Sequence, residues 1–291
     1  MTKPKILISA CLEFEKVRYN GQFIPSQIIR DLIPFAEFIK VCPENEIGLG
    51  VPREPIRIVK KEGQYRLIQH KTERDVTDEM ESFSESFTQN LKEVDGFIFK
   101  SKSPTMGTNN IKVYSSIEKG SAVVDKCGGF FASKIANRYR GYPIEEDDRL
   151  RNPKIRDHFL TRTFLFSRFR EALEKGTLED FHQQNHLLLE FYNTPFKEKL
   201  NLEEEEYFDK IKKITAKPPF SEDIASFFQK FITTSKKDVE KYRDNKITLA
   251  TLKEISKIFI KEESLLQQTF FQPYPEELLL PADENRDKNY W

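Results

Sequence analysis

Short apolar runs alternate with longer amphipathic segments through the first half of the chain. Three of these runs are brief and almost continuously apolar, which is typical of buried parallel strands: Lys5–Ala10, Phe38–Val41 and Gly96–Lys100. Apolar residues at helical spacing predict three helices: Pro25–Phe38, shortened or kinked by Pro34, then Val76–Val94 and Phe130–Arg140.

A hairpin is predicted between the second and third of these strands. Its arms are Ile56–Val59 and Tyr65–Gln69, and they are joined through Glu62-Gly63. Strands that alternate with helices favour a parallel sheet with right-handed crossovers. We therefore expect an α/β domain, a parallel sheet flanked by helices, with any ligand bound beyond the carboxyl ends of the strands.

The pattern changes after Tyr142-Pro143. Amphipathic helical runs with almost no strand signal follow: Pro153–Glu174, Thr177–Tyr192, Leu202–Ile214, Glu222–Ile232 and Leu249–Gln267. We therefore predict two domains, an α/β domain over residues 1–145 and an all-α domain over residues 146–291.

Charge and composition narrow the class of protein. Lysine plus arginine equals aspartate plus glutamate at 47 each, so charge gives no case for nucleic acid or membrane as the main partner. No apolar run approaches the roughly 20 residues of a membrane span, and the run after the N-terminus is too short for a signal peptide. We expect a cytoplasmic protein whose cysteines are free thiols or metal ligands, and the sequence leaves its oligomeric state open.

Three polar segments follow the three predicted strands. They contain Cys11, then Cys42-Pro43-Glu44, then the run from Lys100 to Gly107. A single buried cysteine is most often a small hydrophobic residue, but two at the ends of neighbouring strands favour a site, and thiolates suit iron–sulfur clusters and zinc. Arg18, Arg53 and Lys100 either form an anion pocket or pair with the abundant carboxylates.

In this order, the segments resemble the family catalogued as domain of unknown function 523, some of whose members are 2-thiouracil desulfurases. The resemblance covers roughly residues 4–140 and is carried by two runs, Gly48–Arg53 and Lys100–Pro104. The second half resembles domain of unknown function 1722 through four segments: Pro143–Glu146, Arg149-Leu150, Phe181-His182 and Pro273–Leu278. Together they give the two-domain arrangement of the YbgA-like proteins.

The resemblance implies an enzyme that removes sulfur from a small thiolated nucleobase or similar thioamide. Its cofactor would be a 4Fe-4S cluster held by three cysteines, with an open fourth iron that binds the substrate sulfur as a Lewis acid. By the same resemblance, Cys11 and Cys42 are cluster ligands, Glu44 is the acid/base and Ser103 positions the substrate. Ser101 joins Arg18 and Arg53 in the expected substrate or anion pocket.

The third cluster ligand of the family falls at Met106, whose thioether is a weak, neutral ligand. One hypothesis is that Cys127, in a loop before a predicted helix, supplies the missing thiolate. The alternative is that Cys127 is an incidental small residue. Two other functions compete with the enzyme: a cluster-less homologue that binds a small nucleobase-like or anionic ligand, and an interaction module that acts through the helical domain.

Overall fold

The computed structural model describes residues 2–192, 203–229, 236–243, 249–260 and 263–278. The chain divides into two compact units. One is Lys3–Phe159, called here the α/β unit, and the other is Leu160–Trp291 with Met1–Thr2, called the helical unit. Among the described helices, none has the length and apolar character needed to cross a membrane.

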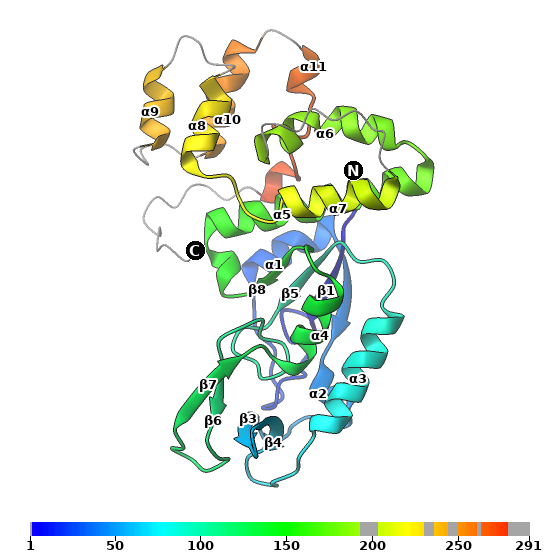
Figure 1. The fold of residues 1–291 in the computed structure, drawn as a ribbon, viewed down its shortest axis with the longest axis vertical. Helices are drawn as coiled ribbons and strands as arrows, with labels where there is room; N and C mark the ends of the chain where they lie inside the picture. The colour runs from blue at the N-terminus through cyan, green and yellow to red at the C-terminus, as the bar shows by residue number, and fades with distance from the viewer. Residues whose placement is uncertain (1, 193–202, 230–235, 244–248, 261–262, 279–291) are drawn as a thin grey trace. The chain divides into compact units, whose positions relative to one another are not determined.

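A four-stranded parallel sheet in the order β2-β1-β5-β8 organises the α/β unit (Figure 1). Its strands are β1 (Lys5–Ser9), β2 (Glu37–Val41), β5 (Gly96–Phe99) and β8 (Ile144–Glu146). Ser9 pairs with Val41 and Ile8 with Ile98, so the carboxyl ends of β1, β2 and β5 lie side by side. The residues that follow these strands therefore emerge at one edge of the sheet.

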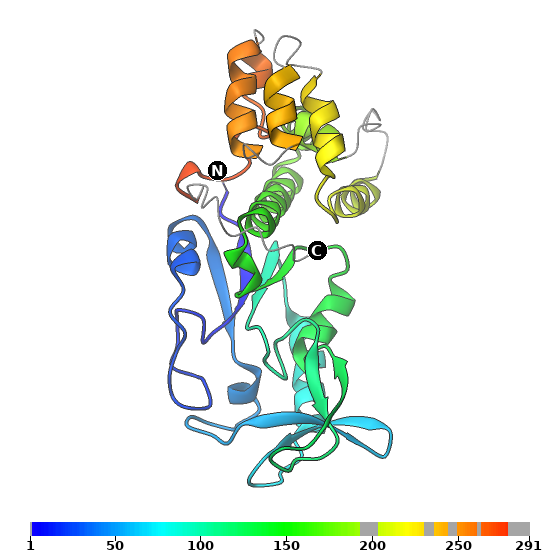
Figure 2. The same cartoon turned by 90° about the vertical axis from the view of Figure 1, so that its left-hand side faces the viewer.

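Helices lie on both sides of this sheet, with α1 (Gln27–Leu32) opposite α3 (Thr77–Asn90) and α4 (Phe130–Arg138) (Figure 2). Successive strand residues point to opposite faces, so Leu7 joins the α3–α4 side while Ile6 and Ile8 do not. The cluster on that side contains Leu7, Phe97, Phe99, Met80 and Phe131, all fully buried. As predicted, Pro34 ends the first helix early, in a 3₁₀ turn over Ile33–Phe35.

A second sheet, in the order β4-β3-β6-β7, lies in the same unit. The predicted hairpin is confirmed as β3 (Ile56–Lys61) and β4 (Gln64–Gln69), which pair antiparallel. The sequence analysis did not predict β6 (Ile111–Tyr114) or β7 (Val123–Cys127). Both are short and carry polar or exposed residues, so neither gives the apolar run on which strand prediction depends.

The described part of the second half is helical, which confirms the predicted fold class. Its elements are α5 (Pro153–Lys175), α6 (Leu178–Tyr192), α7 (Glu204–Ile214), α8 (Ser221–Gln229), α9 (Lys236–Arg243), α10 (Leu249–Phe259) and α11 (Glu263–Leu266), after a 3₁₀ turn at Arg149–Arg151 and before another at Glu276–Leu278. Three parts of the predicted runs lie outside the described residues: Leu202, which begins one run, residues 230–232, which end another, and residues 261–262 inside a third. Packed phenylalanines fill the unit, as where Phe169 stacks on Phe208 with ring centroids 4.6 Å apart.

The predicted domain boundary between residues 145 and 146 falls inside β8. This strand pairs with β5, and Phe97 lies opposite Ile144. Its sequence, Ile-Glu-Glu, contains a single apolar residue and gives no strand signal. The two compact units instead divide after Phe159, within α5, and the exact domain boundary stays a prediction.

Candidate functional site

A cavity of about 390 Å³ opens at the carboxyl ends of β1, β2 and β5. This is the edge where parallel sheets bind ligands, and the volume is that of a small-molecule pocket. Every predicted site residue except Cys127 lines it: Cys11, Arg18, Cys42, Glu44, Arg53, Ser101 and Ser103. Met106 lines it too, so the structure brings together the segments that follow three different strands.

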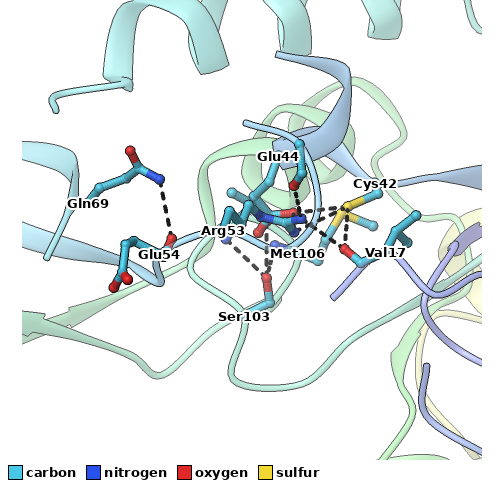
Figure 3. Close-up of polar contacts among 10 residues, drawn as sticks. Val17, Cys42, Glu44, Arg53, Glu54, Gln69, Ser103 and Met106 are labelled. Carbon is cyan, nitrogen blue, oxygen red and sulfur yellow. Dashed lines mark hydrogen bonds and ion pairs between the residues drawn. The ribbon is translucent and has the colours of Figure 1, made fainter. Parts of the chain in front are cut away.

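Glu44 is held from both of its carboxylate oxygens (Figure 3). Thr105 Oγ1 donates to Oε1 at 2.7 Å, and Arg53 Nη2 lies 3.6 Å from Oε2. The Cys42 thiol also donates to Oε2, at 3.4 Å. The side chains of Arg53 and Glu44 are only 6% and 12% exposed, so this pair is screened far less by water than a surface ion pair.

The local sequence explains how Glu44 and Arg53 meet. Cys42 is the last residue before the short helix α2 (Pro43–Glu46), where Pro43 occupies the first helical position that proline favours. The chain then turns through Gly48 and Gly50, both at positive φ, and returns Arg53 to the pocket. Arg53 Nη1 donates to the carbonyls of Val17 at 2.9 Å and Gly50 at 3.0 Å, which ties this turn to the loop after β1.

Ser103 organises the third loop. Its Oγ accepts from the backbone N–H groups of Thr105 at 3.3 Å and Met106 at 3.1 Å, and it lies 3.0 Å from Thr105 Oγ1. Gly129 packs against this loop so closely that a Cβ atom there would lie 2.6 Å from the Thr105 carbonyl. The Gly129 N–H donates to the Gly107 carbonyl at 2.7 Å, so glycine at position 129 permits the contact that fixes the loop.

Most of the cations predicted to form an anion pocket are already paired. Lys100 Nζ donates to Asp147 at 2.8 Å and to Ser101 Oγ at 2.8 Å, and Ser101 Oγ donates in turn to Asp148 at 2.7 Å. Arg53 is paired with Glu44. Arg18 lies over the Tyr19 ring, 5.5 Å from its centroid, and within the described residues no carboxylate lies at salt-bridge distance from it.

Both thiols in the pocket are held neutral. Burial raises the pKa of Cys42 to about 12 and that of Cys11 to about 11, and the nearby Glu44 carboxylate raises both further. A thiol with such a pKa carries its proton near pH 7, so Cys42 donates to Glu44 while its sulfur accepts from Arg53 Nη2 at 3.6 Å. The pocket therefore presents two S–H groups beside one clamped carboxylate.

Comparison with known proteins now adds to this geometry. The family model for 2-thiouracil desulfurase matches residues 6–147. Uncharacterized protein YbbK of Bacillus subtilis (strain 168) is 32% identical over 115 residues, which are 36% of this chain and 75% of that protein. The chain belongs to the 2-thiouracil desulfurase family. A solved structure of the [4Fe-4S]-dependent thiouracil desulfidase TudS matches with 24% identity and a TM-score of 0.39, over 51% of this chain and 94% of that one.

The donor atoms of the pocket do not fit a cluster that three thiolates hold, as the 2-thiouracil desulfurase resemblance implies. Cys11 and Cys42 line the pocket, but the third sulfur there is the thioether of Met106. Cys127 ends β7 in the other sheet, opposite Ile111, and does not line the pocket. Among the described residues, no group of three or more histidine, cysteine, aspartate or glutamate side chains is placed to hold a metal ion.

The sequence did not predict the residues that hold other side chains of this pocket in place. Thr105 clamps Glu44, and its signal was its place between Ser103 and Met106 in a loop already singled out. Asp147 and Asp148, which bind Lys100 and Ser101, follow β8, a strand that gave no signal of its own. From the sequence, Arg53 fits an anion pocket or an ion pair equally well, and the fold places it beside Glu44.

Proposed function

We propose that this chain is a thiouracil-desulfurase-like protein whose pocket binds a small, planar thiocarbonyl compound, a thiolated nucleobase or a similar thioamide. One observation carries the proposal. In a member of this family, a single cavity of about 390 Å³ places a clamped carboxylate beside two neutral thiols. A carboxylate that accepts a hydrogen bond, beside two S–H groups, suits a ligand that has an N–H donor next to a soft sulfur atom.

Each side chain has a distinct part in this binding. Thr105 and Arg53 fix the direction of the Glu44 carboxylate, which retains lone pairs for the N–H of a thioamide. Tyr19 lines the pocket, is 43% exposed and offers a flat aromatic face to a planar base. Met106, Val17 and Val41 give an apolar wall for the sulfur, and Ser103 and Arg18 are proposed to orient polar groups of the ligand.

Sulfur removal through an iron–sulfur cluster with an open iron is the finer hypothesis that the family description suggests. A bound cluster would supply a Lewis acid for the departing sulfur. The pocket offers two thiols and a thioether, and these do not make up the three thiolates that such a cluster would need. The alternative, a homologue that binds the thiocarbonyl compound without cleaving it, requires only the residues that line the pocket. The two hypotheses differ in whether sulfide is released.

Calorimetric titration of the full chain tests the binding. We expect 2-thiouracil or 4-thiouracil to bind at least about tenfold more tightly than uracil, and Glu44→Gln to weaken that binding about tenfold, the loss of one charged hydrogen bond. Glu46→Gln is the matched control, because Glu46 lies on the same short helix but is exposed and does not line the pocket. Equal affinity for the thiolated bases and uracil, or equal losses in the two variants, would contradict the proposal.

The helical unit is proposed to be the domain of unknown function 1722 that its sequence resembles. Phe181 and His182, two residues of that resemblance, are built into the packing of α6 and α7. Phe181 is 4% exposed, and His182 Nδ1 lies 2.7 Å from the Tyr207 hydroxyl. A role of this unit as an interaction module and the cytoplasmic location both stay predictions from the sequence.

A further inference from the structure

Met106 is both a core residue and a wall of the pocket. It is 3% exposed and packs in the hydrophobic cluster that contains Leu7, Phe97 and Phe131. The same residue lines the cavity with Cys11 and Cys42. Its thioether therefore presents an uncharged sulfur to the cavity, where an iron–sulfur cluster would need a thiolate. Methionine is an apolar side chain, so its burial among hydrophobic residues is favourable.

The position of Met106 is fixed by backbone bonds on both sides of its loop. Its N–H donates to Ser103 Oγ at 3.1 Å, and the Gly107 N–H donates to the Ser103 carbonyl at 2.9 Å. From the other side, the Phe130 N–H donates to the Pro104 carbonyl at 3.1 Å, and the Ala132 N–H to the Thr105 carbonyl at 3.0 Å. A side chain substituted at position 106 would therefore start from the same place in the pocket wall.

The three sulfurs also follow three adjacent strands of one sheet. β1 lies between β2 and β5, and neighbouring strands are spaced about 4.8 Å apart. Cys11 comes two residues after the end of β1, Cys42 follows β2 directly, and Met106 lies in the loop after β5. Iron–sulfur clusters are held by cysteine thiolates, and a thioether in one of three positions leaves an iron without its anionic ligand.

We propose that Met106 alone separates this pocket from a cluster site: the wild-type chain holds no iron–sulfur cluster, and Met106→Cys supplies the one thiolate that is missing. The change exchanges an apolar side chain for a smaller one at a backbone position that other residues fix. Cys11 and Cys42 are already in place, and Cys127 has no part in the completed site.

Anaerobic reconstitution with ferrous iron and sulfide tests this proposal on the full chain. Iron, acid-labile sulfide and visible absorption are measured after desalting for the wild type, Met106→Cys and Met106→Leu. We expect the wild type and Met106→Leu to retain only background iron, and Met106→Cys to retain at least about tenfold more, with matching sulfide and a brown colour. Adding Cys11→Ser or Cys42→Ser to Met106→Cys should abolish this gain, and adding Cys127→Ser should not.

Two results would overturn the proposal. In the first, the wild type takes up a cluster that is lost on Cys11→Ser; loss on Cys127→Ser as well would identify Cys127 as the third ligand. In the second, Met106→Cys retains only background iron while its circular dichroism matches that of the wild type. If that spectrum shows a misfolded variant, Met106→Ser with added thiolate ligand, 2-mercaptoethanol, takes its place, and background iron there overturns the proposal equally.

The outcome does not depend on the proposed binding of thiocarbonyl compounds. Binding is read as heat released by 2-thiouracil in protein that holds no iron. Cluster assembly is read as iron and sulfide retained without any ligand present. A wild type that binds 2-thiouracil and takes up a cluster refutes the role of Met106 alone. A wild type that binds neither refutes only the proposed function.

Discussion

Two arginines, one in each unit, place their guanidinium groups away from solvent but have different partners. In the α/β unit, the Arg53 side chain is 6% exposed and lies against the Glu44 carboxylate, the Cys42 sulfur and the carbonyls of Val17 and Gly50. In the helical unit, Arg168 donates from Nε to Asn185 at 3.2 Å and from Nη1 to the Pro273 carbonyl at 2.7 Å. Its Nη2 has no hydrogen-bond partner among the described residues.

The difference lies in the counter-charge. Burial lowers the pKa of Arg168 to about 9, and within the part of the chain that the structure describes no carboxylate acts against that shift. Arg53 has Glu44 as its partner, and the pair stands in a cavity wall that is built from three loops. A buried charge without a partner is a cost to folding, whereas a buried pair fixes the geometry of the groups around it. Arg53, which has a carboxylate partner, thus lies in the candidate site. Arg168, which has none among the described residues, instead joins helix α5 to Asn185 and to the Pro273 carbonyl.

The largest expected effect comes from breaking the pair in the α/β unit. Arg53→Met leaves the Glu44 carboxylate buried without a cation, and we expect the free energy of unfolding of this unit to fall by about 3 kcal/mol, the lower end for a broken buried pair. Hydrogen exchange of peptides from Lys3–Phe159 in the full chain measures it. Arg30→Met is the control, because Arg30 is 48% exposed and its ion pair with Glu13 should contribute little. Equal losses in the two variants would contradict the comparison.

The comparison also shows what could be predicted from the sequence. The strands after which Cys11, Cys42 and Ser103 emerge were predictable, because short apolar runs identify buried parallel strands and such strands end at a shared edge. The partners of those residues were not. Arg53 reaches Glu44 through a turn at two glycines, and Asp147 reaches Lys100 only because β8, a strand with one apolar residue, extends the sheet. Such contacts depend on tertiary pairing, which leaves no local pattern.

A smaller effect of opposite sign is expected in the helical unit. Among the described residues, Arg168 has no carboxylate partner, and Arg168→Met removes its buried charge together with its hydrogen bonds to Asn185 and Pro273. We expect the free energy of unfolding of the unit to rise by about 2 kcal/mol, because relief of the unpaired buried charge should exceed the loss of the two hydrogen bonds. Hydrogen exchange of peptides from the described part of the helical unit measures the gain. Lys175→Met, on the same helix but 63% exposed, should change little. A loss as large as that from Arg53→Met would show that the two arginines are equivalent.

The difference in stability between the wild type and Arg168→Met should also depend on pH. The ordinary pKa of arginine is 12.5, and in the folded helical unit that of Arg168 is about 9. Between these values the unfolded chain still binds a proton that the folded chain has released, so the stability of the wild-type unit should rise with pH. Below pH 9 both states keep the proton and the difference from Arg168→Met is constant. That difference should shrink as pH rises above 9.

The smallest effect separates two hydroxyl groups that support the two arginine sites. Thr105 is fully buried and donates to Glu44 at 2.7 Å, and Thr269 donates to Asn185, the acceptor of Arg168, also at 2.7 Å. We expect Thr105→Val to cost about 1 kcal/mol in the α/β unit, because a charged acceptor loses a donor, and Thr269→Val to cost about 0.5 kcal/mol in the helical unit. Hydrogen exchange of each unit gives both values. If Thr269→Val lowers the free energy of unfolding more than Thr105→Val does, the hydrogen bonds around Arg168 are coupled at least as strongly as those around Arg53 and Glu44. That result would contradict the distinction between an arginine in a candidate site and one that only packs helices together.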